Sequence, residues 1–294
     1  MSIPLTSLED AFSQERFALI GQLRLHQDDG RLELLEQART LAPAVDAVAI
    51  TDCPYGVLHL SALAGAAMLL EAGIDPLINL TARDRNRIAL KSELLGAAAL
   101  GVRNLLLQRG DRLPGDVQPS AKQVFDTGGK RMLSMAKQLS DFGVAKGSGE
   151  LLLGTLATVF DPEAHWRPQE LTAKVDAGAR FVQTQICLDV ELLTRYIKFL
   201  IAAKLTWKCK IIVSVPVLSS AESARWLFEN VRGSVIPESV VRGFEAASDP
   251  HQYGVDYCAD LLRQLKDIPG VSGANLSTPG DASLIVAAIE QAQL

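Results

Sequence analysis

The feature that most constrains the fold of this chain is a regular alternation between short apolar runs and longer segments of helical period. Eight runs rich in aliphatic and β-branched residues predict strands at residues 17–25, 47–52, 76–81, 104–109, 151–155, 181–186, 210–217 and 270–276. Helices are predicted at residues 31–41, 59–72, 85–100, 130–142, 169–177, 190–203, 221–230 and 253–265. Such alternation is typical of right-handed βα units around a parallel sheet, and eight strands can close a barrel. The sequence therefore predicts one α/β domain over residues 1–294, a single (β/α)₈ TIM barrel.

Two alternative architectures are weighed against the barrel. A length of 294 residues suits one barrel as well as two smaller domains, so length alone leaves the domain count open. A doubly wound open sheet also alternates strands and helices. However, no G-x-G-x-x-G fingerprint follows the first predicted strand, as a dinucleotide-binding fold of that kind would show.

Charge and hydropathy exclude several classes of partner. The formal net charge is -5, from 29 basic and 34 acidic residues, so no broad basic surface is expected and nucleic acid is an unsuitable partner. The longest apolar stretch, residues 60–70, includes Ser61 and Gly65 and ends at Glu71, well short of the roughly 20 residues that span a bilayer. The first 17 residues carry acids where a signal peptide carries bases. We expect a cytoplasmic protein without a membrane partner.

Cysteine and histidine spacing argues against metal and covalent chemistry. The four cysteines form no C-x-x-C pair, which fits a reducing compartment and argues against structural zinc. The four histidines show no H-E-x-x-H or two-histidine-carboxylate spacing. No G-x-S-x-G motif or paired Cys/His arrangement is present, so covalent hydrolysis has little support.

Two predicted connections are long enough to have a role beyond connecting. Residues 111–129 follow the fourth predicted strand, and residues 232–251 interrupt the path from the seventh predicted helix to the last. Long loops in a compact barrel are often functional. We expect the first to cover a ligand, whereas the second is equally suited to packing or to a contact in an oligomer.

Polar residues follow the apolar strands at the end where the βα loops of a barrel share one mouth. They are Gln22, Thr51, Asp52, Asn79, Thr81, Arg83, Asp84, Arg109, Gly110, Asp111, Thr155, Thr158, Gln185, Ser214 and Asn275. Chance explains Thr51, Ser214 and Asn275, because a strand that leaves the core must become polar somewhere.

The most informative of these strand ends reads Gln-Arg-Gly-Asp at residues 108–111. Arg109 and Asp111 are candidates for a salt bridge between two loops. In the competing interpretation, Gly110 permits close backbone approach while the flanking charges orient a planar polar ligand. Gln183 and Gln185 stand two apart on one predicted strand and so point to the same face, where a ligand or other interior side chains must satisfy their amides.

Two long segments carry a resemblance to a known family. Residues 76–111, PLINLTARDRNRIALKSELLGAAALGVRNLLLQRGD, resemble the central stretch of the methylenetetrahydrofolate reductase family, with its threonine-containing strand end and terminal RGD. Residues 173–191, AKVDAGARFVQTQICLDVE, are similar to that family's KVDAGA and TQ-x-x-x-D run. The order and spacing of the other junctions agree, so the resemblance covers nearly the whole chain.

This resemblance implies an FAD-binding barrel that moves a hydride from a nicotinamide, through the flavin, to methylenetetrahydrofolate. Arg109 and Lys174 would serve the pyrophosphate and ribose side, and Asp111 the pyrimidine end of the isoalloxazine. The loop with Lys122 and Phe125 would close over the adenosine. The full set of expected cofactor contacts is Thr51, Asn79, Thr81, Arg109, Gly110, Asp111, Lys122, Leu156 and Lys174. The expected folate contacts are Gln22, Asp111, Gln183 and Gln185.

Departures from the family pattern bear on catalysis. Where the family carries a glutamate as general acid, this chain has Gln22, and an amide cannot donate a proton at neutral pH. Asp52 and Asp84 stand at neighbouring strand ends, and Asp52 is the preferred substitute, so the expected catalytic set is Gln22, Asp52 and Asp111. Asn79 replaces a histidine, Leu156 replaces a tyrosine, and residues 214–219 match imperfectly.

The leading hypothesis is an FAD-dependent reductase of one-carbon metabolism and methionine biosynthesis that interconverts methylene- and methyl-tetrahydrofolate. A second is a folate- or flavin-binding accessory barrel with lost or weak hydride transfer, which Gln22 motivates. A third is a reductase of another pterin or one-carbon carrier. The electron donor, NADH or NADPH, the direction of flux and the state as homo-oligomer or partner subunit stay open.

Overall fold

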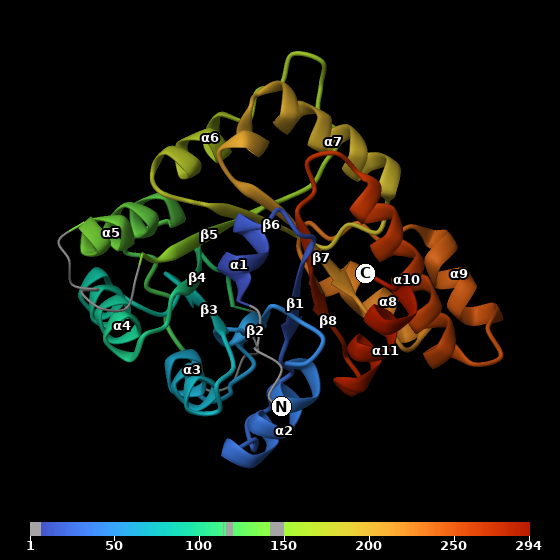
Figure 1. Ribbon diagram of the computed structural model, residues 1–294, viewed down its shortest axis with the longest axis horizontal. Helices are drawn as coiled ribbons and strands as arrows, with labels where there is room; N and C mark the ends of the chain where they lie inside the picture. The colour runs from blue at the N-terminus through green and yellow to red at the C-terminus, as the bar shows by residue number, and fades with distance from the viewer. Residues whose placement is uncertain (1–6, 114, 116–119, 142–149) are drawn as a thin grey trace.

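The computed structural model describes residues 7–113, 115, 120–141 and 150–294. Its strands form a closed parallel barrel in the order of the sequence, which confirms the predicted fold class. They are β1 (Ala18–Gln22), β2 (Ala47–Ile50), β3 (Pro76–Thr81), β4 (Asn104–Gln108), β5 (Leu152–Ala157), β6 (Phe181–Thr184), β7 (Lys210–Pro216) and β8 (Gly273–Ser277). Figure 1 shows the strands as an inner ring, with helices around it.

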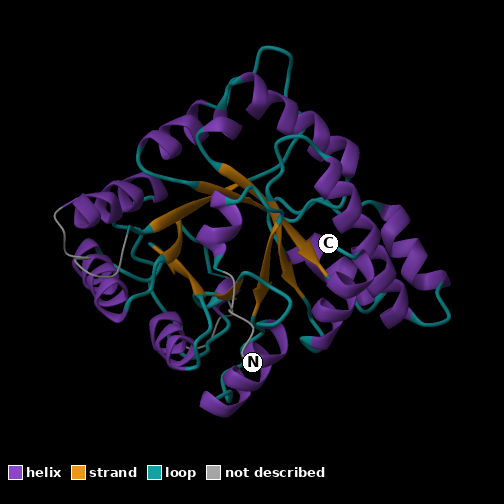
Figure 2. Ribbon diagram, in the orientation of Figure 1, coloured by secondary structure: helices purple, strands orange, loops and turns teal. Residues whose placement is uncertain are grey.

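The helices of the ring are α2 (Arg31–Leu41), α3 (Ala62–Glu71), α4 (Arg87–Leu100), α5 (Gly129–Asp141), α6 (Gln169–Asp176), α7 (Val190–Ala202), α8 (Ala221–Asn230), α10 (Pro250–Asp267) and α11 (Ser283–Ala292). Further helices are α1 (Leu8–Ser13), α9 (Glu238–Ala246) and the 3₁₀ turns η1 (Pro54–Gly56) and η2 (Leu205–Trp207). Figure 2 shows the separation of inner strands from outer helices that a (β/α)₈ barrel requires.

Three helices were absent from the sequence prediction. The connection predicted over residues 232–251 contains α9, which lies between Pro237 and Pro250. The predicted set also lacked α11, the helix that follows β8, and the six-residue α1. The local signal for α1 is a capping box, in which Ser7 and Asp10 bond each other's backbone N–H groups.

Side chains of alternate strand residues fill the barrel interior. The inner cluster includes Ile20, Leu77, Leu106, Phe181 and Ile212, from five different strands. The Phe181 ring fits only because residue 154 of the neighbouring strand β5 is glycine, since a Cβ there would lie 2.1 Å from the ring. The register pairs these two residues directly.

α1 closes one end of the barrel. Its Leu8, Ala11 and Phe12 join the inner cluster, and the Phe12 ring lies 6.0 Å from the Phe181 ring between centroids. In Figure 1 this helix crosses the centre of the ring of strands. These apolar residues of α1 cover the amino-terminal ends of the strands. The polar residues lie at the opposite, carboxyl-terminal mouth.

A second apolar layer lies between the outward strand faces and the helices. The helices that supply it are punctuated as local chemistry requires. Asn86 accepts hydrogen bonds from the N–H groups of Ile88 and Ala89 to begin α4, and Gly101, with a φ of 86°, is the C-cap of this helix. Within the described part of the chain, no helix has both the length and the apolar character needed to span a bilayer.

Candidate functional site

A cavity of about 1590 Å³ opens above the carboxyl-terminal ends of β4, β5 and β6. The loop after β4, the start of α5, the loop between β5 and α6, and α6 itself form its walls. Arg109, Asp111 and Lys174, expected around the flavin, and Gln185, expected to contact folate, all line this cavity. Gly110 and Leu156 from the expected cofactor set line it as well.

The turn at residues 109–111 is held tightly against the neighbouring strand. Gly110 has a φ of 81°, and a Cβ there would lie 3.0 Å from the Arg83 Cβ and 3.2 Å from the Thr81 Cβ. Glycine is therefore required by both conformation and space. The sequence suggested that Gly110 permits a close approach of the backbone to a ligand. In the structure the backbone at Gly110 instead approaches the end of β3 and the residues after it, and this contact fixes the positions of the Arg109 and Asp111 side chains.

Arg109 and Asp111 do not bridge each other among the described ion pairs. The Arg109 guanidinium instead lies over the Phe125 ring, 4.2 Å from its centroid, in a cation–π contact. Lys174 pairs with Glu170 one turn earlier on α6 at 2.9 Å and donates a hydrogen bond to the Leu156 carbonyl. A guanidinium held by a ring keeps its hydrogen-bond donors available.

Basic side chains outnumber acidic ones along the described lining of the cavity. Six basic residues line it, Arg109, Lys130, Arg131, Arg167, Lys174 and Arg232, against the acidic Asp111, Asp126 and Glu170. The whole chain has a formal charge of -5, so the cavity reverses the sign of the protein as a whole. A concave site with this charge concentrates anionic ligands.

An aromatic wall borders the same cavity and was not predicted from the sequence. The Phe160 and Trp166 rings of the loop between β5 and α6 lie 5.1 Å apart, and both contact Tyr196 of α7 at 5.6 and 5.7 Å. All three line the cavity. Such faces suit a planar ligand. The sequence signal that could have revealed this wall is three aromatic residues in a chain that is only 5% aromatic. They are separated by 6 and 30 residues, and this spacing forms no recognisable motif.

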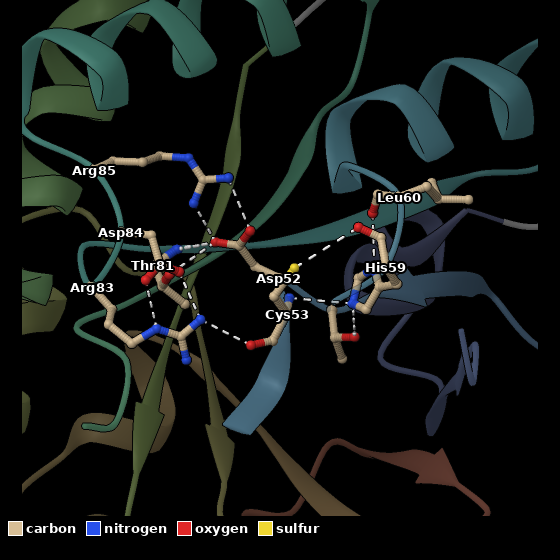
Figure 3. A network of polar contacts seen from close by, with 9 residues as sticks. Asp52, Cys53, His59, Leu60, Thr81, Arg83, Asp84 and Arg85 are labelled. Carbon is tan, nitrogen blue, oxygen red and sulfur yellow. Dashed lines mark hydrogen bonds and ion pairs between the residues drawn. The ribbon is translucent and has the colours of Figure 1, made fainter. Parts of the chain in front are cut away.

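Asp52, expected as a substitute acid, lies in a buried network on the other side of β4 (Figure 3). Its carboxylate accepts hydrogen bonds from the Thr81 N–H at 2.8 Å and the Thr81 hydroxyl at 2.9 Å. It also forms a bidentate ion pair with Arg85, at 2.6 and 2.9 Å. Four donors occupy the two oxygens of this carboxylate, and this geometry counts against the expected catalytic role.

The partners of Asp52 and Asp84 are arginines held by the same network. Burial alone favours neutral Arg85, but its hydrogen bonds to Asp52 and that residue's charge raise the pKa of Arg85 above its ordinary value. Arg83 bonds Asp84 at 2.6 and 2.8 Å and donates to the Cys53 carbonyl at 2.9 Å (Figure 3). Asp52 thus joins the loop after β2 to Thr81 and Arg85, whereas Asp84 holds Arg83, which bonds the same loop.

That loop is also held by His59, which is buried. Its Nδ1 faces the Leu60 carbonyl at 2.8 Å, so this nitrogen carries the proton. Nε2 then accepts hydrogen bonds from the Cys53 N–H and the Thr51 hydroxyl, both at 3.2 Å. Thr51 therefore serves the wall of the mouth, and it does not line the cavity.

The same loop presents Tyr55, a residue that the sequence did not single out. Cys53 and Tyr55 both have positive φ, 44° and 57°, which is uncommon for side chains of this size. The Tyr55 ring packs edge-on against Trp226 of α8, 5.9 Å between centroids. Burial, with a further effect of the Asp111 charge, raises the pKa of Tyr55 to about 12. The phenol therefore keeps its proton at neutral pH.

A layer of amides lines the barrel interior at the mouth. Gln183 donates to the Ser214 hydroxyl at 3.1 Å, and Ser214 in turn donates to the Thr184 carbonyl at 2.6 Å. Because the hydroxyl proton is used, Ser214 can only accept from Gln183, which fixes the orientation of that amide. The Gln183 Oε1 is buried and has no hydrogen-bond partner among the described residues. The same holds for the Oδ1 atoms of Asn79 and Asn275.

Gln22 ends β1 in this layer, where its Oε1 accepts from the Asn275 amide at 3.4 Å. Several expected site residues thus lie in the mouth but outside the described lining of the cavity: Gln22, Thr51, Asp52, Asn79, Thr81 and Gln183. Lys122 is exposed and also lies outside that lining, whereas Phe125 from the same loop belongs to it.

Metal ligands are not grouped in the part of the chain that the structure describes, where no set of three His, Cys, Asp or Glu side chains could hold an ion. The four cysteines are free thiols. Burial raises the pKa of Cys187 to about 11 and those of Cys209 and Cys258 to about 12. These thiols are packing residues.

Comparison with known proteins gives a family match over most of the chain. The family model described as methylenetetrahydrofolate reductase matches residues 26–293. A Caenorhabditis elegans protein named probable methylenetetrahydrofolate reductase (NADPH) is 26% identical over 212 residues. That match includes 69% of this chain and 30% of the relative, so the chain spans less than a third of the relative's length.

Solved structures share the barrel at low sequence identity. A Clostridium thermocellum protein that binds two copies of 5-methyl-5,6,7,8-tetrahydrofolic acid superposes with a TM-score of 0.66 and 13% identity, over 97% of this chain and 96% of that one. A 2,3-dimethylmalate lyase gives a TM-score of 0.51 at 14% identity, over 96% of this chain and 84% of that one. At these identities the likeness shows the fold alone.

Proposed function

The chain belongs to the methylenetetrahydrofolate reductase family, and from that premise we propose that it is an FAD-dependent oxidoreductase. The proposed reaction interconverts 5,10-methylenetetrahydrofolate and 5-methyltetrahydrofolate, with a nicotinamide as the electron donor. The observation that carries the proposal is the convergence of Arg109, Asp111, Lys174 and Gln185 on one cavity rich in basic residues. The named ligand of the Clostridium thermocellum structure supports the folate part.

The residues present fit a flavin dinucleotide. The cavity holds an excess of basic side chains for a diphosphate, aromatic faces for planar rings and a volume of about 1590 Å³, more than a typical cofactor site needs. We assign Arg109 and Lys174 to the pyrophosphate and ribose side of FAD and Asp111 to the pyrimidine end of its ring system. When bound, the flavin supplies reversible uptake and release of a hydride.

On the substrate side, Gln185 and Asp111 would bind the pterin, whose ring nitrogens and amino group offer donors and an acceptor. The carboxylate of Asp111 would also disfavour negative charge on a neighbouring ring. Phe160, Trp166 and Tyr196 would exclude water from one side of the site. The proton required for opening the imidazolidine ring of the substrate would come from a group other than Gln22 and Asp52.

A direct test uses the purified protein. A flavin absorbance band between the near ultraviolet and the blue should bleach when 5-methyltetrahydrofolate is added without oxygen. Arg109→Met should lower flavin retention at least about tenfold, since it removes a charge-assisted contact. The matched control, Arg263→Met on α10, removes a cation that pairs with Asp260 away from the cavity and should retain flavin as the wild type does. Absence of bleaching in flavin-loaded protein would refute the reductase proposal.

A second candidate function follows from Gln22. Its amide bonds Asn275, and the nearby carboxylates of Asp52 and Asp84 are held in ion pairs. These contacts favour an accessory barrel that binds folate or flavin with weak hydride transfer. In that case Gln22→Glu should create or sharply raise reductase activity. A wild-type turnover already equal to that of Gln22→Glu would exclude this candidate.

A further inference from the structure

The connection between α8 and α9 reaches the mouth of the barrel. It begins after Asn230, the last residue of α8, and ends before Glu238, the first residue of α9. Within it, the Val235 N–H donates to the Ile186 carbonyl at 2.9 Å, and the Val235 carbonyl accepts from the Leu188 N–H at 2.8 Å. Because Ile186 and Leu188 follow β6, this connection lies beside the carboxyl-terminal end of that strand.

Gly233 fixes the place of its neighbour Arg232 in this connection. Its φ is 80°, and a Cβ there would lie 2.8 Å from the Thr158 Cγ2. Both conformation and space therefore require glycine. Thr158 follows β5, and Arg232, Gly233 and Thr158 line the same cavity. The connection thus brings a guanidinium to the ends of β5 and β6 from a distant part of the sequence.

Arg232 carries a charge that no acidic residue neutralises in the part of the chain that the structure describes. The residue is exposed, and its side chain takes part in none of the ion pairs or hydrogen bonds of that part. The acidic residues between Thr158 and Thr172 have other partners, which are Arg195 for Asp161, His165 for Glu163 and Lys174 for Glu170. The guanidinium therefore keeps its N–H donors for an external acceptor.

The cavity presents an apolar ring close to this guanidinium. Phe160 stands two residues after Thr158, lines the cavity and is 41% exposed. The rings of Trp166 and Tyr196 support it at 5.1 and 5.6 Å between centroids. An exposed aromatic ring held in a cavity near an unpaired guanidinium suits a ligand that carries an aromatic ring and a carboxylate close together.

Gln185, assigned above to the pterin of the substrate, lies between these elements. Its N–H donates to the Ala157 carbonyl at 2.8 Å, and each of these two residues directly precedes one that contacts the α8–α9 connection. Beyond its pterin, a folate consists of an aminobenzoyl ring followed by a glutamate with two carboxylates. A folate whose pterin contacts Gln185 therefore has Phe160 and Arg232 within reach of its tail.

We propose that Arg232 binds a carboxylate of the glutamate tail of a folate, with the aminobenzoyl ring against Phe160. The inference rests on the proposed function and adds to it a contact that distinguishes folates from pterins without such a tail. A guanidinium suits this role because it holds a carboxylate through two parallel N–H···O bonds. A phosphate of the flavin would use the same bonds, and the test separates the two anions.

The test compares two ligands that differ only in the glutamate. Tetrahydrofolate carries it and tetrahydropteroate lacks it, and neither has the methyl group that would return a hydride to a flavin. Calorimetric titration of flavin-loaded protein without oxygen measures both affinities, and flavin fluorescence after dilution measures flavin retention. The variant is Arg232→Met. Its matched control is Arg225→Met, because Arg225 lies on α8, pairs with Glu245 and stands outside the described lining of the cavity.

Arg232→Met should weaken tetrahydrofolate binding at least about tenfold and leave tetrahydropteroate binding within about twofold of wild type. Its flavin retention and melting temperature should match those of the wild type, because the side chain is exposed and unpaired among the described residues. Arg225→Met should bind both ligands as the wild type does. Phe160→Leu should weaken both ligands by the same factor, since both carry the aminobenzoyl ring.

Three outcomes would overturn the inference: the wild type binds both ligands equally tightly, Arg232→Met loses affinity for both alike, or Arg232→Met releases flavin as readily as Arg109→Met. The proposed function fails separately. If flavin-loaded protein does not react with 5-methyltetrahydrofolate while Arg232→Met still weakens tetrahydrofolate binding selectively, the contact with the folate tail stands and the reductase activity does not.

Discussion

Replacing Asp52 by asparagine separates a structural role for this carboxylate from the catalytic role that the sequence suggested. Asp52 is 6% exposed, and it faces Arg85 at 2.6 and 2.9 Å. The introduced amide would keep one acceptor for Thr81 but turn an N–H₂ group toward the donors of Arg85. Loss of one partner of a buried ion pair costs about 3–5 kcal/mol. Because the Arg85 side chain is 18% exposed, we expect the lower end, about 3 kcal/mol.

The assay is urea unfolding followed by circular dichroism for four proteins: wild type, Asp52→Asn, Arg85→Met and the double variant. The double variant should recover at least about 1 kcal/mol relative to the sum of the single changes, because no charge is then left unpaired. Asp28→Asn, a change at an exposed aspartate, is the control and should stay within about 0.5 kcal/mol of wild type.

The reasoning is refuted if Asp52→Asn unfolds at the wild-type urea concentration and the double variant shows no coupling. Should that stable variant also lose turnover, Asp52 would regain the role of acid. The structural interpretation instead predicts that affinity and turnover fall together as the wall of the mouth loosens.

Three further predictions test the packing and ionisation of the barrel. Gly154→Ala should destabilise the protein by about 1–3 kcal/mol, because its Cβ would lie 2.1 Å from the Phe181 ring, and adding Phe181→Leu to it should partly restore stability. Gly128→Ala is the control, because a Cβ there meets no atom within 4 Å, and equal stability of the two alanine variants would contradict the prediction. Only Cys53, the one half-buried thiol, should react with a disulfide reagent in native protein, and four thiols should react after unfolding; a second fast native thiol would be inconsistent with the burial described. Burial raises the pKa values of Tyr55, Tyr196 and Tyr257 to about 12, above the usual 10. The stability that these three phenols contribute should therefore be present below pH 10 and be lost as the pH rises from about 10 to 12. Phenolate absorbance from all four tyrosines at pH 10 in still-folded protein would contradict these raised pKa values.

Sequence predicted the barrel well because each strand is a self-contained signal. β3, for example, is an apolar run over Pro76–Thr81 that matches its predicted bounds, since both its faces are buried. α1 escaped detection because six residues do not complete enough turns to show a period. α9 was mistaken for part of a loop because Pro237 and Pro250 frame it, although both stand where helices begin.

The candidate site could be predicted only where a strand end and a motif coincide. Arg109, Asp111 and Gln185 follow apolar strands directly, and the structure brings them to one cavity. The ion pair of Asp52 could not be foreseen, since Arg85 lies 33 residues later and nothing in the spacing links the two.

These contacts divide the mouth of the barrel into two halves with different electrostatics. On the side of β2 and β3, arginines neutralise the carboxylates of Asp52 and Asp84, so charge is used to build the wall. On the side of β4 to β6, cations outnumber acids along the described lining, so charge remains for an anionic ligand. Gln22, where the family resemblance leads us to expect a glutamate, ends β1, and its Oε1 accepts a hydrogen bond from Asn275 of β8. Gln22 lies outside the described lining of the cavity, so an amide in place of a carboxylic acid at this position would leave the proposed cofactor site unchanged. The two candidate functions therefore differ in turnover and agree in ligand affinity, and measuring only binding cannot distinguish them.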